Sequence, residues 1–401
     1  MNQQLFYEAD RPIVKIHGEI EERMHDQDKR EFGGIYYTNK ARKLHVALLE
    51  NSHYAFEEKI VAQDVELHSV RHSWDYLNGV QAAVNSLVGS YGIHGSGLEA
   101  HNNRIYISVD EVNADITAAI QSEMRKLGYS DLSAYTIRVM PRAYPFQLPG
   151  DERKDDETDK IEENAASLLA EPRSSNTIYP GGMIVYRNSS GGYSHLASVN
   201  FGYILNGVPF IVGAGHACSN NAIGRDAYFV PYSGSGYPIS NVAATYNSGN
   251  RFKIGTVALR NCGGNYDFHT IRVTESGLNF TYTCYNGWKV SSGGGTVSQG
   301  SALRICGITT RYDAGYEYGY CLDAQASVSA YDTLMTNLIQ ADFGANNGTS
   351  GGPLITVASD GSIRLVGSAS VNGTSSFYCT RIQYMVDAYG LTVMPEGSIS
   401  V

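Results

Sequence analysis

The sequence predicts two differently built domains, a smaller α+β domain in residues 1–150 and an all-β domain in residues 177–401. Two contrasts support this division. Residues 1–175 contain 19 Lys and Arg against 29 Asp and Glu, whereas the remaining 226 residues contain 11 of each. Glycine follows the opposite trend, with 10 in the first part and 33 in the second, and all six cysteines lie in the second part.

A charge-rich run at residues 151–176 separates the two domains. Such a run cannot bury enough apolar surface to become ordered, and exposed connections of this kind are readily cut by proteases. We expect either a plain solvated linker or a linker that is processed.

Composition excludes several classes of protein. Hydrophobic residues make up 42% of the chain and charged residues 17%, which is not typical of a disordered polyelectrolyte. No segment approaches the roughly 18 consecutive apolar residues of a spanning helix, and the opening segment lacks the apolar core of a signal peptide. Neither domain has a basic surplus that would neutralise phosphates, so we expect neither a membrane nor a nucleic-acid partner.

The N-terminal domain shows alternating strand and helix patterns. We expect an N-terminal hairpin over 34–49, helices over 74–88 and 114–128, and strands over 104–109 and 135–140. No nucleotide-binding loop or metal-ligand spacing occurs, and we expect no metal and no cofactor. We interpret the histidines of this domain as surface or packing residues; they are His17, His25, His45, His53, His68, His72, His94 and His101.

After the linker the pattern changes to short runs of Val, Ile, Tyr, Phe and Thr between Gly, Asn and Ser turns. Many short strands with closely spaced turns predict a closed antiparallel barrel or a sandwich. A segment of about 226 residues is long enough for two small barrels.

Three segments of the β domain carry residues suited to nucleophilic catalysis. Ser350 lies in a glycine-rich turn, NGTSGGPL, His216 follows an apolar strand in PFIVGAGHACS, and Asp267 enters a strand in GGNYDFHTIRV. A hydroxyl needs a base to become a good nucleophile, and a carboxylate can hold that base in the right tautomer. Taken singly, such residues are usually a hairpin serine, a structural histidine and a turn-forming aspartate.

Together, these segments resemble the trypsin/chymotrypsin-like serine endopeptidases, and more closely the streptogrisin and α-lytic protease branch. The resemblance covers about residues 178–392 and implies a double β-barrel. It implies that Ser350 is the nucleophile, His216 the general base and Asp267 the orienting carboxylate. The backbone N–H groups of Gly348 and Ser350 would form the oxyanion hole.

The resemblance also implies a substrate pocket lined by Gly344, Ser370, Val371 and Asn372. Gly344 stands where a trypsin-like enzyme has an acidic residue, so we expect no preference for Lys or Arg, and instead a small or medium apolar side chain. It further implies a disulfide between Cys306 and Cys321. A bond between Cys218 and Cys262 is a second possibility, and Cys284 and Cys379 have no assigned partner.

Residues 1–150 are similar to the pro-domains of the same branch, which assist folding and inhibit the protease until they are cleaved off. We therefore expect a secreted, monomeric proenzyme that acts on proteins or peptides and has its own N-terminal domain as a partner. Thr349 replaces the Asp that normally precedes the nucleophile, so activation should not depend on a new α-amino group near Thr177. Two alternatives are an inactive relative that only binds peptides and an N-terminal adaptor domain without an inhibitory role.

Overall fold

The computed structural model describes most of both predicted domains. The described residues are His17, Ile20, 30–38, 43–50, Ser52, 65–145, 176–187, 193–218, 222–231, 251–284, 289–290, 297–307, 317–344, 349–357, 362–373 and 376–401. Residues 151–175 of the predicted linker lie outside this set, so the linker stays a prediction.

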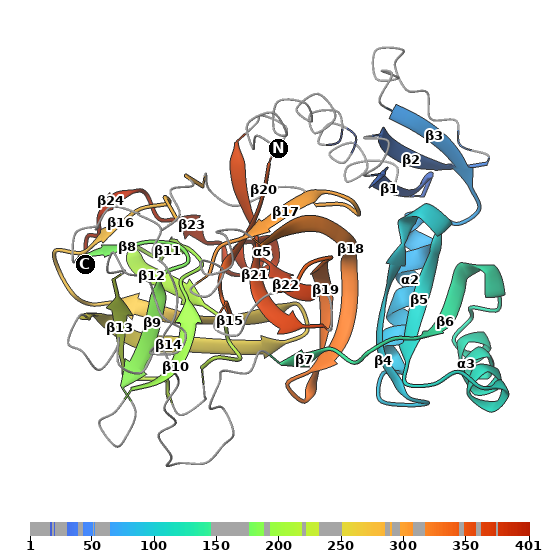
Figure 1. Ribbon diagram of the computed structural model, residues 1–401, viewed down its shortest axis with the longest axis horizontal. Helices are drawn as coiled ribbons and strands as arrows, with labels where there is room; N and C mark the ends of the chain where they lie inside the picture. The colour runs from blue at the N-terminus through green and yellow to red at the C-terminus, as the bar shows by residue number, and fades with distance from the viewer. Residues whose placement is uncertain are drawn as a thin grey trace, which may run out of the picture.

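The N-terminal domain contains a three-stranded sheet and a helix-covered sheet (Figure 1). Its elements are β1 (Phe32–Thr38), β2 (Lys43–Leu49), β3 (Val65–Val70), α2 (Trp74–Ser86), β4 (Ile93–Glu99), β5 (Arg104–Val109), α3 (Ala114–Lys126), β6 (Tyr135–Val139) and β7 (Tyr144–Pro145), with 3-10 turns at Ala100–Asn102 and Leu132–Ala134. The predicted hairpin, helices and strands are confirmed, with ends shifted by a few residues.

Both helices begin at side chains that cap their free N–H groups. The Ser73 hydroxyl accepts a hydrogen bond from Tyr76 N at 3.1 Å, and the Asn113 side chain accepts one from Ile116 N at 2.9 Å. Such caps satisfy donors that have no partner inside a helix. The apolar face of α2 packs on β4 and β5 in one core; its buried residues include Leu77, Val80, Val84, Ile93, Ile105, Ile107, Ile120 and Met124.

The β domain contains two large curled sheets and a small three-stranded sheet of order β24-β16-β8. The first has the order β10-β9-β13-β14-β15-β12-β11-β23, and the second contains β17-β20-β21-β22-β19-β18, with a further β17–β18 pairing that closes it into a barrel. The all-β fold predicted for this domain is confirmed. Its elements are β8 (Thr177–Ile178), β9 (Met183–Arg187), β10 (Tyr193–Ser198), β11 (Gly202–Leu205), β12 (Val208–Gly213), β13 (Asp226–Val230), β14 (Phe252–Gly263), β15 (Tyr266–Val273), β16 (Asn279–Phe280), β17 (Ala302–Ile305), β18 (Glu317–Ala330), β19 (Thr333–Ala341), β20 (Pro353–Val357), β21 (Ile363–Asn372), β22 (Phe377–Arg381), α5 (Ile382–Tyr389), β23 (Thr392–Val393) and β24 (Gly397–Ser398).

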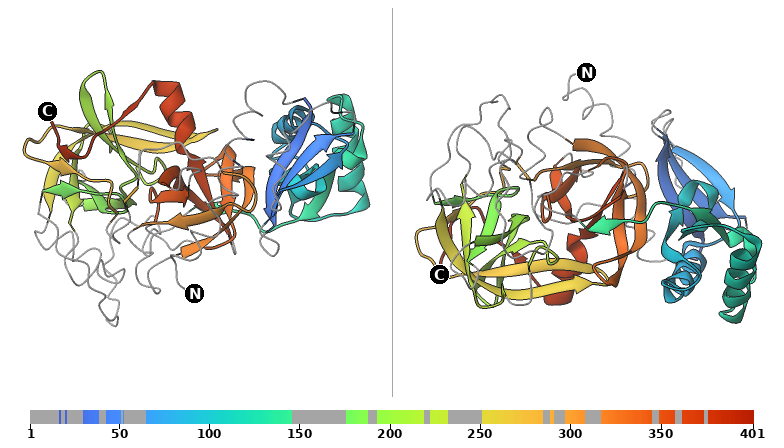
Figure 2. Two further views of the ribbon diagram at one scale, coloured as in Figure 1. Left: turned by 90° about the horizontal axis from the view of Figure 1, so that it is seen from above. Right: turned by 60° about the horizontal axis from the view of Figure 1, so that its bottom comes forward.

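Two strand pairings join the two domains, in addition to an isolated bridge between Tyr36 and Gln299. Strand β4 pairs with β18 through Ser96↔Ser327 and Gly95↔Val328, so the helix-covered sheet continues into the second barrel. The chain after β6 then crosses to the β domain, where β7 pairs antiparallel with the end of β21 (Figure 2). The N-terminal domain is therefore anchored to the second barrel at both contacts.

The disulfide predicted between Cys306 and Cys321 is wrong. Cys321 N donates to Ser301 O, so Cys321 lies opposite a residue five positions before Cys306. At about 3.3 Å per residue this offset is roughly 16 Å, far beyond the ~4.4–6.8 Å that separates bonded Cα atoms.

No disulfide forms among the six cysteines, all of which lie in described parts of the chain. The possible Cys218–Cys262 bond is absent because the two thiols face different partners. The thiol of Cys218 contacts Tyr186, and that of Cys262 contacts Asp267. Burial raises the pKa of Cys218 to about 11 and that of Cys262 further, so both thiols are protonated at neutral pH.

In the parts of the chain that the structure describes, no helix has both the length and the apolar character needed to cross a bilayer.

Candidate active site

His216 is placed by the turn that follows β12. This strand pairs with β15 on one side and β11 on the other, which fixes its end inside the first sheet. Gly215 precedes His216, and a Cβ added there would lie 2.3 Å from Asn261 O. The close passage of two backbones therefore requires glycine, as expected for a tight turn.

Asp267 is the second residue of β15 and pairs with Cys262 of β14. Its side chain is fully buried, and His216 and Ser370 make three hydrogen bonds to it. Oδ1 accepts from His216 N at 2.7 Å, while Oδ2 lies 2.7 Å from His216 Nδ1 and accepts from Ser370 Oγ at 2.5 Å. The carboxylate thus fixes both the backbone and the ring of His216.

Ser350 lies in the turn before β20, in the second barrel. Gly351 follows it with φ +80°, a conformation that favours glycine. Ser350 O accepts a hydrogen bond from Ser198 N of β10 at 2.7 Å, which connects this turn to the first sheet. Ser350 Oγ then lies 2.8 Å from His216 Nε2. Ser350 and His216 therefore come from different sheets and meet where the two sheets join.

The electrostatics suit this arrangement. Burial opposes ionisation of Asp267, but the proximity of His216 and the hydrogen bonds from His216 and Ser370 outweigh it, so its pKa is lowered. An ionised carboxylate can only accept hydrogen bonds, so His216 Nδ1 carries a proton. Nε2 then presents its lone pair to the Ser350 hydroxyl, which is the orientation a general base needs.

Tyr331 covers the imidazole. It lies at the tip of the β18–β19 hairpin, where Tyr331 and Asp332 both have positive φ (54° and 58°) in a two-residue turn. Its ring stacks on His216 with centroids 4.6 Å apart and planes inclined by 12°, and its hydroxyl donates to Ser370 O. As a result, the His216 side chain is only 4% exposed. The sequence pattern gave no signal for this contact.

His269 supports the turn that carries His216. It lies in β15, is fully buried, and its Nδ1 is 2.7 Å from Ala214 O. Its other ring nitrogen contacts the Tyr186 hydroxyl. Burial lowers the pKa of His269 to about 4, so the ring is neutral. The alternation of β15 places Asp267 and His269 on the same face, a signal that was present in the sequence.

The residues predicted to line the substrate pocket have different surroundings. Ser370 and Val371 are fully buried in β21, and the Ser370 hydroxyl is used by Asp267. Val371 and Asn372 pair with Pro145 and Tyr144 of β7.

Two further predicted positions, Gly344 and Gly348, come shortly before Ser350 in the sequence. Gly344 is exposed, with nothing within 4 Å of an added Cβ. Gly348, the predicted oxyanion donor, lies outside the described residues. The pocket and the oxyanion hole therefore stay predictions.

Several solved structures are similar to this chain. The Nocardiopsis protease NAPase is 20% identical and covers 55% of this chain and 100% of its own, with a TM-score of 0.38. A glutamic acid specific serine protease is 23% identical over 54% of this chain and 100% of its own (TM-score 0.38), and the alpha-lytic protease homolog N4 is 18% identical over the same shares (TM-score 0.39). No protein-family profile and no curated protein sequence match the chain.

Proposed function

We propose that this chain is a serine endopeptidase made as a proenzyme. The observation that carries this proposal is the continuous hydrogen-bonded line from buried Asp267 through His216 to the Ser350 hydroxyl, with links of 2.7 and 2.8 Å. Neither of the two sheets alone supplies all three groups. A hydroxyl, an imidazole and a carboxylate arranged in this way have a specific role in catalysis. The arrangement turns a weak nucleophile into one that can attack a carbonyl.

The proposed reaction proceeds in two halves. Ser350 Oγ bonds to the carbonyl carbon of a peptide while its proton passes to His216 Nε2, and the backbone N–H groups of Gly348 and Ser350 would stabilise the oxyanion. His216 then gives that proton to the leaving amine as the C–N bond breaks, which leaves an acyl group on Ser350. Water, deprotonated by His216, releases the acid and restores the hydroxyl. Asp267 stabilises the imidazolium in both halves.

The contacts of the N-terminal domain support the proenzyme part of the proposal. Strand β7 lies antiparallel along β21 next to the residues that we propose bind substrate, so it takes backbone positions that an extended peptide would use. Strand β4 holds β18, whose hairpin tip carries Tyr331 over His216. The docked domain thus blocks the cleft in two ways, by covering β21 and by fixing the hairpin.

Release of the N-terminal domain is therefore the proposed activation step. Proteins or peptides are the proposed substrates. Secretion and a monomeric state stay predictions based on the resemblance of the motifs.

Labelling by a fluorophosphonate probe tests the proposal. We expect no labelling of the Ser350→Ala variant, slow labelling of the intact chain, and labelling at least tenfold faster after cleavage between residues 151 and 175 and removal of the N-terminal fragment. Equal rates before and after removal would indicate an adaptor rather than an inhibitor. Absence of labelling in the freed β domain, with its fold intact by circular dichroism, would contradict the enzyme and favour a protein that only binds peptides.

A further inference from the structure

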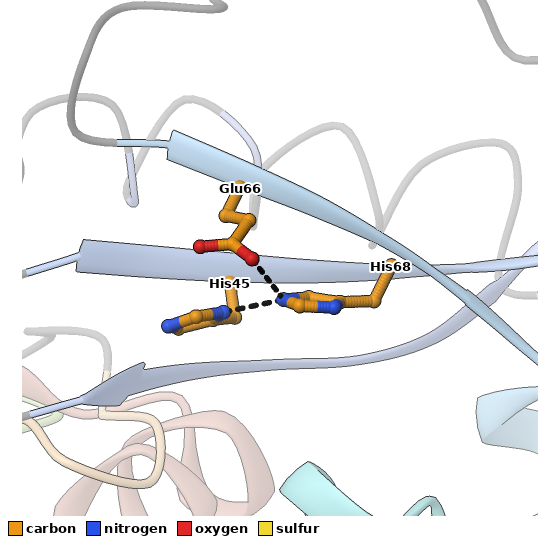
Figure 3. A group of neighbouring side chains, drawn as sticks. All are labelled: His45, Glu66 and His68. Atoms are coloured by element: carbon orange, nitrogen blue, oxygen red, sulfur yellow. Dashed lines mark hydrogen bonds and ion pairs between the residues drawn. The ribbon is translucent and has the colours of Figure 1, made fainter.

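Two histidines and a glutamate converge on one face of the β1-β2-β3 sheet, remote from Ser350 in sequence and built entirely from the N-terminal domain. His45 lies in β2, and Glu66 and His68 lie in the parallel strand β3. The register pairs His45 with Glu66, and His68 is two residues further along the same strand. Because side chains alternate along a strand, all three lie on the same face, as Figure 3 shows.

The three polar ends meet at close range. His45 Nδ1 lies 2.5 Å from His68 Nε2, and Glu66 Oε1 lies 3.7 Å from the same nitrogen (Figure 3). One possible ligand atom from each residue falls within 4.8 Å of the other two. The sequence shows no ligand spacing among these histidines, and His45 and His68, 23 residues apart, come together only through the pairing of β2 with β3.

The surroundings orient both imidazoles. His45 Nε2 lies 3.0 Å from Thr38 Oγ1, and a proton donated there leaves the lone pair of Nδ1 directed at His68. Tyr36 stacks on the His45 ring with centroids 4.7 Å apart and an interplanar angle of 4°. Lys43 pairs with Oε2 of Glu66 at 3.6 Å, which leaves Oε1 facing the histidines. Thr38 and Tyr36 thus act as a supporting layer behind the ligand atoms.

A cation bound at this point would replace the proton that the two facing ring nitrogens share and would take a carboxylate oxygen as its third ligand. Zn²⁺ binds histidine nitrogen at about 2.0–2.1 Å, so two tetrahedral histidine ligands have nitrogens roughly 3.3 Å apart. Small side-chain rotations would widen the present 2.5 Å separation to that value. A set of two nitrogens and one oxygen favours zinc, copper, nickel or cobalt over magnesium and calcium.

We propose that His45, Glu66 and His68 form a binding site for a divalent transition metal ion of the zinc class. Each residue supplies one ligand atom, and water completes the tetrahedron. The side chains of Glu66 and His68 are 46% and 34% exposed, so an ion can enter from solvent. Binding links β2 to β3 and stabilises the folded N-terminal domain, because the ion binds the folded state preferentially. This proposal does not depend on the protease activity.

The test uses the full chain without a polyhistidine tag, carrying Ser350→Ala to prevent self-cleavage. Titration with Zn²⁺ followed by calorimetry should show one site, and Co²⁺ should give the intense visible bands of a tetrahedral site without a sulfur-to-metal band. Glu66→Gln and His68→Gln should each weaken binding at least tenfold. His101→Gln is the matched control, since this exposed histidine lies near Tyr36 but outside the cluster, and it should bind as the parent does.

Thermal unfolding supplies a second readout. Zn²⁺ should raise the midpoint of the N-terminal domain in the parent and in His101→Gln, and should leave it unchanged in His68→Gln. Equal zinc affinity in the parent and His68→Gln would overturn the proposal. A sulfur-to-metal band would also overturn it, because the ion would then be bound by cysteine. Loss of zinc binding in His216→Ala, but not in His68→Gln, would place the ion at the triad instead.

Discussion

Asp323 lies at the contact between the two domains and should make that contact depend on pH. It belongs to β18 and is 2% exposed. Oδ2 accepts from Leu98 N of the N-terminal domain at 2.8 Å, and Oδ1 accepts from Gln325 N at 2.7 Å. The Tyr106 hydroxyl adds a further hydrogen bond from the N-terminal domain. Burial still dominates and raises the pKa of Asp323 to about 7.

The direction and size of the pH dependence follow from the linkage between proton binding to Asp323 and docking of the two domains. Undocking removes Leu98 and Tyr106 and exposes the carboxylate, so its pKa should fall towards the ordinary ~3.9. The docked state therefore binds a proton more tightly, and docking is strongest at low pH and weakens as the pH rises through about 7. A difference of roughly three pKa units corresponds to about 4 kcal/mol in total, and to roughly 100-fold in docking affinity between about pH 5 and pH 8.

The buried neighbours Tyr106 and Cys321 do not mask this titration. Burial raises the pKa of Tyr106 and of Cys321 well above their usual values, so both stay neutral across this range. His94 of β4 has a pKa lowered chiefly by burial, so any titration of His94 on docking would act in the opposite direction.

The assay compares Asp323 with Asp323→Asn in the Ser350→Ala background. The chain is cut within residues 151–175 by an added protease, and the affinity of a labelled N-terminal fragment is measured by anisotropy from pH 5 to pH 8. Asparagine mimics the protonated acid, so its profile should be nearly flat while the parent weakens. Parallel profiles in the two proteins, or docking that strengthens as the pH rises, would refute the reasoning.

Two further predictions concern the candidate active site, and a third concerns the cysteines. Ser370→Ala removes one of three hydrogen bonds to the charged Asp267 and should lower kcat/KM of the freed β domain by about 10- to 100-fold; an unchanged kcat/KM would contradict the role assigned to this hydroxyl. Tyr331→Ala uncovers His216, so fluorophosphonate should label the intact chain faster, whereas Tyr331→Phe, which keeps the ring, should change labelling less. Because no disulfide joins the described cysteines, dithiothreitol should leave the midpoint of thermal unfolding unchanged, whereas loss of a native bond would cost about 2–5 kcal/mol.

Local pattern was sufficient to predict the N-terminal hairpin, both helices, β5 and β6, but it did not predict β3 or β4. Local signals act over a few residues, so they can be recognised in contiguous sequence. They include strand alternation, helical spacing and caps such as Ser73 and Asn113. The triad could be proposed for a related reason, since each of its residues lies in a short turn or strand entrance of distinctive composition. The distances between these residues depend on how the two large sheets of the β domain pack together. No single segment of the sequence specifies that packing.

The disulfide prediction failed because a resemblance in cysteine position does not fix strand register. The β17–β18 pairing sets Cys321 opposite Ser301 and away from Cys306. Strand register also explains the histidine cluster. His45 and His68 meet because β2 and β3 pair in parallel with one register. A shift of one residue would turn one of them to the other face of the sheet.

The sequence by itself indicated the change in composition around residues 151–176, many of the local elements and three residues suited to nucleophilic catalysis, because composition and short-range periodicity are properties of contiguous segments. Only the tertiary structure decided that Tyr331 covers His216, that β7 lies along β21, and that Asp323 is buried between domains. Those contacts join residues far apart in the chain, and their geometry depends on strand register and on which surfaces exclude water.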